Sequence, residues 1–157
     1  MPILTIRSVM DVTCTACSGQ WPSADYRIAD CGTSLAYLFE DQFFPGWTVL
    51  VLKRHATELF QLSANERSEL IEEVSMVGQA LMEVFHAAKI NYELLGNQLP
   101  HIHWHIIPRL TNDPAPRDPV WTVRHEKQPL TPTDLAERVA LVRSRLFLKS
   151  PDHPSLL

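Results

Sequence analysis

The segment from Gly96 to Arg109 constrains the fold of this chain more than any other stretch. At its centre, His101, His103 and His105 alternate with large apolar residues. Successive side chains of a β-strand point to opposite faces, so the pattern predicts a strand with three imidazoles on one face and apolar side chains on the other. The outer two histidines would lie about 13 Å apart along it. Three titratable rings in a row on one surface predict a functional site.

Size and composition indicate an ordinary globular protein. The 157 residues predict one domain over residues 1–149, followed by a flexible C-terminal tail at residues 150–157. A formal charge of −4 argues against a nucleic-acid binder held by a basic surface. The sequence lacks an apolar run of about 18 residues, so we expect no membrane span. Met1–Val12 lacks the apolar core of a signal peptide, and three cysteines do not make a disulfide framework, so a cytoplasmic protein is expected.

Periodicity predicts several strands outside the histidine segment. They are expected at residues 26–28, 35–39, 48–52 and 90–95. Pro108 is expected to end the histidine strand because it lacks a backbone N–H. The proline-rich segment 111–132 is expected to form a loop, with a short extended piece at Trp121 and Val123.

Two longer helices and one brief helix are also predicted. Ser63 and Glu66 have the spacing of a capping box, and apolar residues behind them recur at intervals of three and four, which predicts a helix of about 25 residues. Thr131 and Pro132 are typical of the cap and first position of a last helix. A brief helix is expected at residues 57–62.

The pair Cys14 and Cys17 has three interpretations. A Cys-x-x-Cys turn supplies two zinc ligands, forms a redox pair, or is a structural coincidence. A tetrahedral zinc site needs two further ligands. His55, at the end of an expected strand, is a candidate ligand of a second site. Cys31 is expected to be a small core residue.

The alternating histidines have two chemical interpretations. Histidines two apart on one strand face can share a zinc ion. Alternatively, a neutral imidazole whose far nitrogen is held by a hydrogen bond can attack phosphorus or carbon with its near nitrogen. A purely structural histidine cluster is the third alternative, and three histidines in register argue against it.

Residues 101–107 match the signature His-φ-His-φ-His-φ-φ, where φ is apolar, at every position. Gly96-Asn97 precedes the match, Pro108-Arg109 follows it, and Pro45-Gly46 stands before an expected strand. With these landmarks, residues 14–121 resemble the histidine triad (HIT) superfamily. The resemblance is strongest to its bacterial branch of small nucleotide hydrolases.

This resemblance implies an α+β fold, in which a long helix packs across an antiparallel sheet of about five strands, and a homodimer. It implies a nucleotide phosphohydrolase or nucleotidyl transferase that acts on dinucleoside polyphosphates or AMP conjugates. His103 would attack the α-phosphate and form a nucleotidyl-histidine that water hydrolyses. His105 would contact the phosphate or the leaving oxygen, and His101 would orient the row. No catalytic metal is expected.

The resemblance also suggests substrate contacts by position. Asn91 and Asn97 are candidates for binding phosphate, and Glu40 or Asp41 for binding the ribose hydroxyls. Two departures from the family pattern stand out. Asn97 stands where many members have Gln, and Trp47 stands after Pro-Gly where members commonly have His.

Zinc-bearing relatives use two N-terminal cysteines, a histidine after the Pro-Gly strand and the first triad histidine. The matching residues here are Cys14, Cys17, His55 and His101. The resemblance therefore implies a structural zinc site with no open position for substrate.

Two alternatives to the covalent mechanism stay open from the sequence. One is a zinc-dependent hydrolase in which the triad histidines bind the metal. The other is a nucleotide-binding signalling protein with incidental turnover.

Overall fold

The structure, a computed structural model, describes residues 13–147. Its strands are β1 (Arg27–Asp30), β2 (Ser34–Leu38), β3 (Thr48–Leu52), β4 (Lys89–Glu93) and β5 (His103–Arg109), and its α-helices are α1 (Ala64–Phe85) and α2 (Pro132–Phe147). Neither helix in this part of the chain has an apolar stretch of the length that a membrane crossing needs. The N-terminal segment Met1–Val12 and the tail expected from residue 150 lie outside the described residues.

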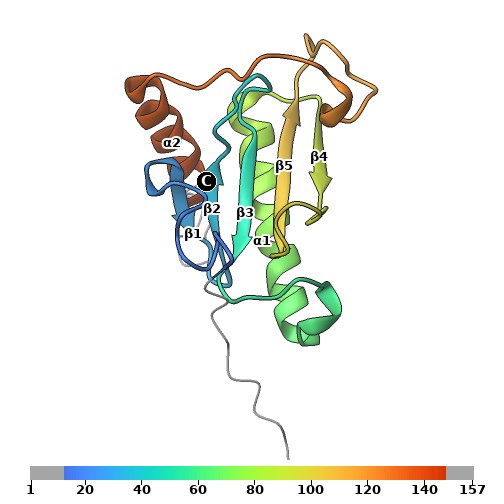
Figure 1. Ribbon diagram of the computed structural model, residues 1–157. Coiled ribbons are helices and arrows are strands. Elements are labelled where there is room, and N and C mark those ends of the chain that lie inside the picture. Colours follow the sequence, from blue (N-terminus) through green and yellow to red (C-terminus); the bar gives the residue numbers. More distant parts are fainter. Residues whose placement is uncertain (1–12, 148–157) are drawn as a thin grey trace, which may run out of the picture.

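The described strands form one antiparallel sheet in the order β1-β2-β3-β5-β4. β1, β2 and β3 follow one another along the chain, whereas β5 is the last strand in sequence and lies between β3 and β4 (Figure 1). This arrangement places the histidine strand inside the sheet. The expected α+β fold with a five-stranded antiparallel sheet is confirmed.

α1 lies behind the sheet and packs against it in a core to which α2 also contributes (Figure 1). The predicted capping box starts it: Glu66 N donates to Ser63 Oγ at 3.1 Å, and Ser63 N donates to the Glu66 carboxylate at 2.7 Å. The helix ends at Phe85, because His86 adopts the left-handed conformation with φ of 49°. Of the apolar residues that recur at intervals of three and four, Leu70, Val74, Val77 and Leu81 are buried, whereas Val84 is half-buried and Ala88 is exposed and lies beyond the helix.

β5 separates two environments, as the alternating pattern predicts from residue 103 onward. Trp104 and Ile106 belong to the core between the sheet and α1. His103 and His105 lie on the opposite face, where Val49 is the β3 partner of His105. The apolar positions therefore anchor the strand, and the alternation presents two histidines together on the other side.

The strand begins two residues later than the pattern predicts, so His101 precedes it. Ile102 N donates to Ala56 O at 2.8 Å, and Leu52 N donates to Ile102 O at 3.0 Å. These bonds attach the backbone before His103 to the chain that leaves β3. His101 therefore lies outside β5, although Ile102 packs in the same core as Trp104 and Ile106, as the alternation predicts.

β5 also continues through Pro108, which was expected to end it. Pairing between β3 and β5 stops at Ile106, whereas pairing with β4 continues to Arg109. Beyond Ile106 the strand has a ladder on one side only, so the missing N–H of Pro108 interrupts no bond to β3.

Two short predicted elements take a different form. The helix expected at residues 57–62 is a single 3-10 turn at Leu59–Gln61. The extended piece expected around Trp121 is a 3-10 turn at Val120–Thr122. Val120 is buried in an apolar cluster with Phe44, and this long-range contact outweighs the local preference for extended backbone.

The segment of residues 111–131, here called the crossover segment, runs over one end of the sheet to α2 (Figure 1). Arg109, which is 4% exposed, fastens its first part. The guanidinium donates to the Asp113 carboxylate at 2.6 and 3.1 Å, and to the carbonyls of Ala115 at 2.6 Å and Asp118 at 2.8 Å. The Asn91 side-chain oxygen accepts a further bond at 2.6 Å. Each of its five N–H groups therefore has an acceptor.

α2 closes the outer edge of the sheet beside β1. It begins at Pro132, and Thr131 Oγ1 accepts a bond from Asp134 N at 3.2 Å, as the sequence predicts. Arg143 donates to two carbonyl oxygens of β1, at 2.7 and 2.9 Å. This side chain occupies acceptors that an exposed edge strand would leave open.

The buried Arg109–Asp113 pair predicts a stability effect. Replacing Asp113 with Asn should lower the free energy of unfolding by about 3 kcal/mol, because it leaves a buried guanidinium without its counter-charge. The Arg109 hydrogen bonds lower the pKa of Asp113, so the carboxylate stabilises the fold above its unfolded pKa. That contribution is lost as the pH falls through the lower folded pKa.

Urea denaturation at several pH values measures both effects. Asp30→Asn is the control, because Asp30 forms an exposed pair with Lys53 and the change should cost less than about 1 kcal/mol. Equal losses in the two variants would contradict this account of Arg109.

Candidate functional site

A cavity of about 810 Å³ is lined by His103 and His105. Its aromatic lining comes from three separate parts of the chain: Trp21, Phe39 and Trp121. Its remaining polar side chains include Glu40, Asn97, Gln98 and Lys127. The volume suits a small organic ligand, and the mixture of aromatic walls with a few polar groups is typical of such sites.

One ring nitrogen of His103 is occupied by a hydrogen bond to the backbone. Its Nδ1 lies 2.7 Å from the carbonyl oxygen of His101. A carbonyl oxygen only accepts, so Nδ1 carries the hydrogen and Nε2 keeps its lone pair. Burial lowers the pKa of His103 below its usual value, which favours the neutral ring. A neutral imidazole held in this tautomer can act as a nucleophile or as a general base.

His105 lies beside His103, with ring centroids 5.1 Å apart. Its Nδ1 is 3.1 Å from the indole nitrogen of Trp47, and the edge of its ring is close to Phe39 and Trp121. Burial, together with the neighbouring His103, lowers the pKa of His105 to about 4. Both cavity histidines are therefore neutral rings near pH 7.

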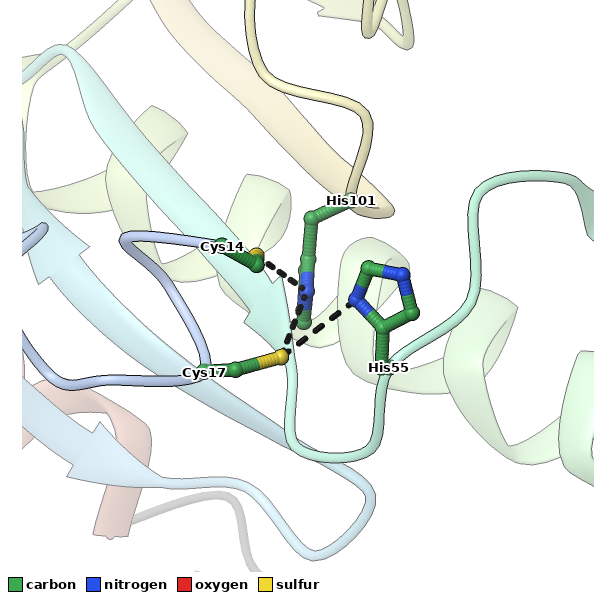
Figure 2. Close-up of side chains that lie close together, drawn as sticks. All are labelled: Cys14, Cys17, His55 and His101. Atoms are coloured by element: carbon green, nitrogen blue, oxygen red, sulfur yellow. Dashed lines mark hydrogen bonds between the residues drawn. The ribbon is translucent and has the colours of Figure 1, made fainter. Parts of the chain in front are cut away.

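His101 points toward a second cluster and not into this cavity. Its Nε2 donates to the Leu52 carbonyl at 2.7 Å, which leaves the Nδ1 lone pair facing Cys14 at 3.4 Å and Cys17 at 3.6 Å. His55 Nδ1 lies 3.3 Å from Cys17 Sγ. Figure 2 shows the four side chains converging on one point. Their ligand atoms all lie within 4.8 Å of one another, which brings together the four residues named from the sequence.

The spacing of the cluster formed by Cys14, Cys17, His55 and His101 fits a tetrahedral metal ion. Bonds of about 2.3 Å to sulfur and about 2.0 Å to nitrogen, at a tetrahedral angle, place S and N about 3.5 Å apart. Three of the four S···N distances here are 3.3, 3.4 and 3.6 Å, and the fourth, between Cys14 and His55, is within 4.8 Å. Two thiols and two imidazoles are a donor set that zinc prefers. The Leu52 carbonyl is the outer partner that orients His101 for such a role.

Of the four residues predicted to contact the substrate, two line the cavity and two do not. Asn97 and Glu40 line the cavity. Asn91 is not among the cavity residues, and its side-chain oxygen accepts a bond from Arg109.

Asp41 is also absent from the cavity lining, since it holds the crossover segment. Its carboxylate lies 2.8 Å from His125 Nε2 and accepts bonds from Gln128 N at 3.1 Å and Phe43 N at 3.0 Å. Burial opposes its ionisation, yet these hydrogen bonds outweigh burial and lower the pKa of Asp41. Asp41 therefore acts beside the cavity, on the segment that supplies part of its wall.

Sequence reasoning missed four aromatic or charged residues of the cavity: Trp21, Phe39, Trp121 and Lys127. Trp121 and Lys127 belong to the crossover segment, whose proline-rich sequence has no periodicity. Trp21 follows the cysteine pair and contacts His103 edge-on at 5.2 Å. The one sequence signal that could have identified the tryptophans is the presence of large aromatic residues in segments predicted to be loops.

The fold and the site define a class of protein: an α+β domain whose inner strand presents neighbouring neutral histidines to a ligand-sized cavity. The model of the HIT domain matches residues 25–112, more than half of the chain. The protein therefore belongs to the HIT family.

Solved structures share this fold. A histidine triad protein from Bradyrhizobium japonicum is 31% identical, with a TM-score of 0.70 over 76% of this chain and 89% of that one. A structure described as a Zn-bound histidine triad family protein, from Mycobacterium smegmatis, is 23% identical, with a TM-score of 0.62 over 83% of this chain and 88% of that one. The second likeness shows the fold alone.

A curated relative has a stated activity. The asymmetrical bis(5'-nucleosyl)-tetraphosphatase of Schizosaccharomyces pombe is 30% identical over 94 residues, which make up 57% of this chain and 52% of that protein. This chain thus spans about half the length of the relative.

Proposed function

We propose that this protein cleaves nucleotides at the α-phosphate through a covalent nucleotidyl-histidine on His103, as a phosphohydrolase or a nucleotidyl transferase. The observation that carries the proposal is the hydrogen bond from His103 Nδ1 to the His101 carbonyl, within a ligand-sized cavity. That bond leaves Nε2 as the nitrogen with a lone pair. The activity named for the Schizosaccharomyces pombe relative supports a nucleotide as the substrate.

The reaction consists of two displacements at phosphorus. His103 Nε2 attacks the α-phosphorus in line, a P–N bond forms, and the bond to the leaving oxygen or nitrogen breaks. Water, or another acceptor in a transfer reaction, then attacks the same phosphorus, and the P–N bond breaks with its electron pair returning to Nε2. The bond to the His101 carbonyl stabilises the positive charge that the ring gains in the first step.

The remaining cavity residues fit a nucleotide. We assign His105 to contact with a phosphate or leaving oxygen, and Asn97, which lines the same cavity, to binding phosphate. Glu40 is the remaining candidate for the ribose hydroxyls, although it also pairs with Lys127 at 2.8 Å. The aromatic side chains on both flanks of the histidine pair can stack on bases. These features support dinucleoside polyphosphates or AMP conjugates as substrates.

The alternative in which the triad binds a catalytic metal has less support. His101 faces the cysteines, whereas His103 and His105 face the cavity and have separate partners. The ligand cluster among the described residues contains only the first of the three histidines. A purely nucleotide-binding protein would use the same cavity, so turnover must be measured directly.

His103→Ala is expected to lower the cleavage rate of an AMP conjugate by at least about 10³-fold, because the nucleophile is lost. AMP should still bind, since the aromatic walls are unchanged. The measurements are steady-state cleavage and AMP binding by calorimetry, with His86→Ala, at the end of α1, as the matched control. Cleavage by His103→Ala at the wild-type rate would contradict the covalent mechanism. A wild-type protein that binds AMP and leaves conjugates intact for hours would indicate a binding protein.

We also propose that Cys14, Cys17, His55 and His101 hold a structural zinc ion. The donor set and the S···N distances support this assignment. A bound ion would fasten the turn that carries the two cysteines to the chain just after β3 and just before β5. Because Cys14 also lines the cavity, the ion would steady one cavity wall without taking part in the reaction.

Protein purified without chelator is expected to contain about one zinc ion per chain, and Cys17→Ser should lose it. Cys31→Ser is the matched control, because Cys31 lies outside the cluster and should leave the zinc content unchanged. Elemental analysis measures the content, and less than about 0.2 zinc per wild-type chain would contradict the proposal. Chelation should lower thermal stability before it lowers turnover, whereas a catalytic zinc would reverse that order.

A homodimer is our proposal for the assembly. β4 forms one edge of the sheet, and Tyr92 on this strand is 43% exposed, so a second copy could extend the sheet there. Sedimentation equilibrium should give twice the chain mass of 17.9 kDa. A single-chain mass at micromolar concentration would contradict it. The cytoplasm stays our expectation for the compartment.

A further inference from the structure

The hydrogen-bond partner of His105 is Trp47, and burial fixes the positions of both side chains. The Trp47 indole nitrogen lies 3.1 Å from His105 Nδ1, and the two residues are 2% and 6% exposed. Trp47 directly precedes β3 and packs in a buried cluster with Phe44, Ile107 and Val120. The indole cannot turn away without disrupting that cluster, so this hydrogen bond is a built-in feature of the site.

The chemistry of the bond determines where the His105 proton lies. An indole N–H donates and never accepts, so Nδ1 of His105 must be the acceptor and carries no hydrogen. A neutral imidazole has its one hydrogen on the other nitrogen, which here is Nε2. His103 has the opposite arrangement, because its Nδ1 donates to a carbonyl. The neighbouring rings are thus held in complementary tautomers, one with a lone pair at Nε2 and the other with an N–H.

We propose that Trp47 is a positioning residue that holds His105 as the Nε2–H tautomer, so that His105 donates a hydrogen bond to a phosphate or leaving-group oxygen. The catalytic part of this inference rests on the proposed function, and the tautomer itself does not. With the opposite tautomer, a lone pair would face the negatively charged oxygen. Burial favours the neutral ring, so the donor role requires the correct tautomer and not a protonated histidine.

The identity of residue 47 matters because indole permits only one direction for the bond. A histidine at this place, which the family pattern would supply, can donate or accept according to its own tautomer. Trp47 removes that choice. The departure from the family pattern noted in the sequence therefore has a specific consequence for the neighbouring catalytic group.

Nitrogen NMR of protein labelled at histidine tests the tautomer without any substrate. His105→Gln identifies the His105 signals. In the wild type, Nδ1 should resonate as an unprotonated nitrogen and Nε2 as a protonated one near pH 7. Trp47→Phe keeps an aromatic ring but removes the donor, so the two signals should move toward the values of exchanging tautomers.

Trp121→Phe is the matched control. The Trp121 ring lies 5.0 Å from His105, but its indole donates to Glu93, so the His105 signals of this variant should keep the wild-type pattern.

Kinetics test the consequence for the reaction. Trp47→Phe should lower kcat about 10- to 100-fold with KM changed less than about threefold, because a transition-state donor is weakened and the walls remain. Trp47→His should recover part of the loss, since imidazole can also donate. A protonated Nδ1 in wild-type His105, or wild-type kcat and unaltered His105 signals in folded Trp47→Phe, would overturn the proposal.

The outcomes remain distinct if one variant fails to fold. Thermal melting reports folding, and the wild-type spectrum together with Trp47→His then decides the tautomer. A wild-type protein that has the expected tautomer but cleaves no nucleotide conjugate would overturn the proposed function. It would still support the inference that Trp47 holds the His105 hydrogen on Nε2.

Discussion

The hydrogen bond from His103 Nδ1 to the backbone carbonyl of His101 is the interaction on which the site depends. The backbone that supplies this carbonyl lies just before β5, and the bonds of Ile102 to the end of β3 and to the chain beyond it hold it there. The His101 side chain points toward the cysteines. The segment just before β5 therefore supplies both the carbonyl that gives His103 its tautomer and the imidazole that joins the cluster of Cys14, Cys17 and His55.

Each triad histidine has one ring nitrogen committed to a different neighbour. His101 donates to the Leu52 carbonyl at the end of β3, His103 donates to the His101 carbonyl, and His105 accepts from Trp47 just before β3. The neighbouring strand and its flanks thus position two of the three rings. The partners hold His101 and His105 with the hydrogen on Nε2 and His103 with the hydrogen on Nδ1, and burial favours the neutral form of each.

The sequence predicted features that depend on local patterns. The capping box of α1, the start of α2 and the opposite environments of His103 and Trp104 all follow from spacing alone. The cysteine and histidine quartet needed the family resemblance, because its members come from three distant segments. Contacts made by the crossover segment could not be predicted, since its prolines and polar residues have no period. The Arg109 network and the placement of Trp121 depend on tertiary packing, and so does the continuation of β5 through Pro108.

The central claim is that His103 forms a covalent intermediate, and the stereochemistry at phosphorus tests it most directly. A substrate with a chiral α-phosphorothioate is cleaved in isotopically labelled water, and the configuration of the product is determined. Two in-line displacements, one by His103 and one by water, predict retention of configuration. Inversion would mean that water attacks directly, and it would contradict the account.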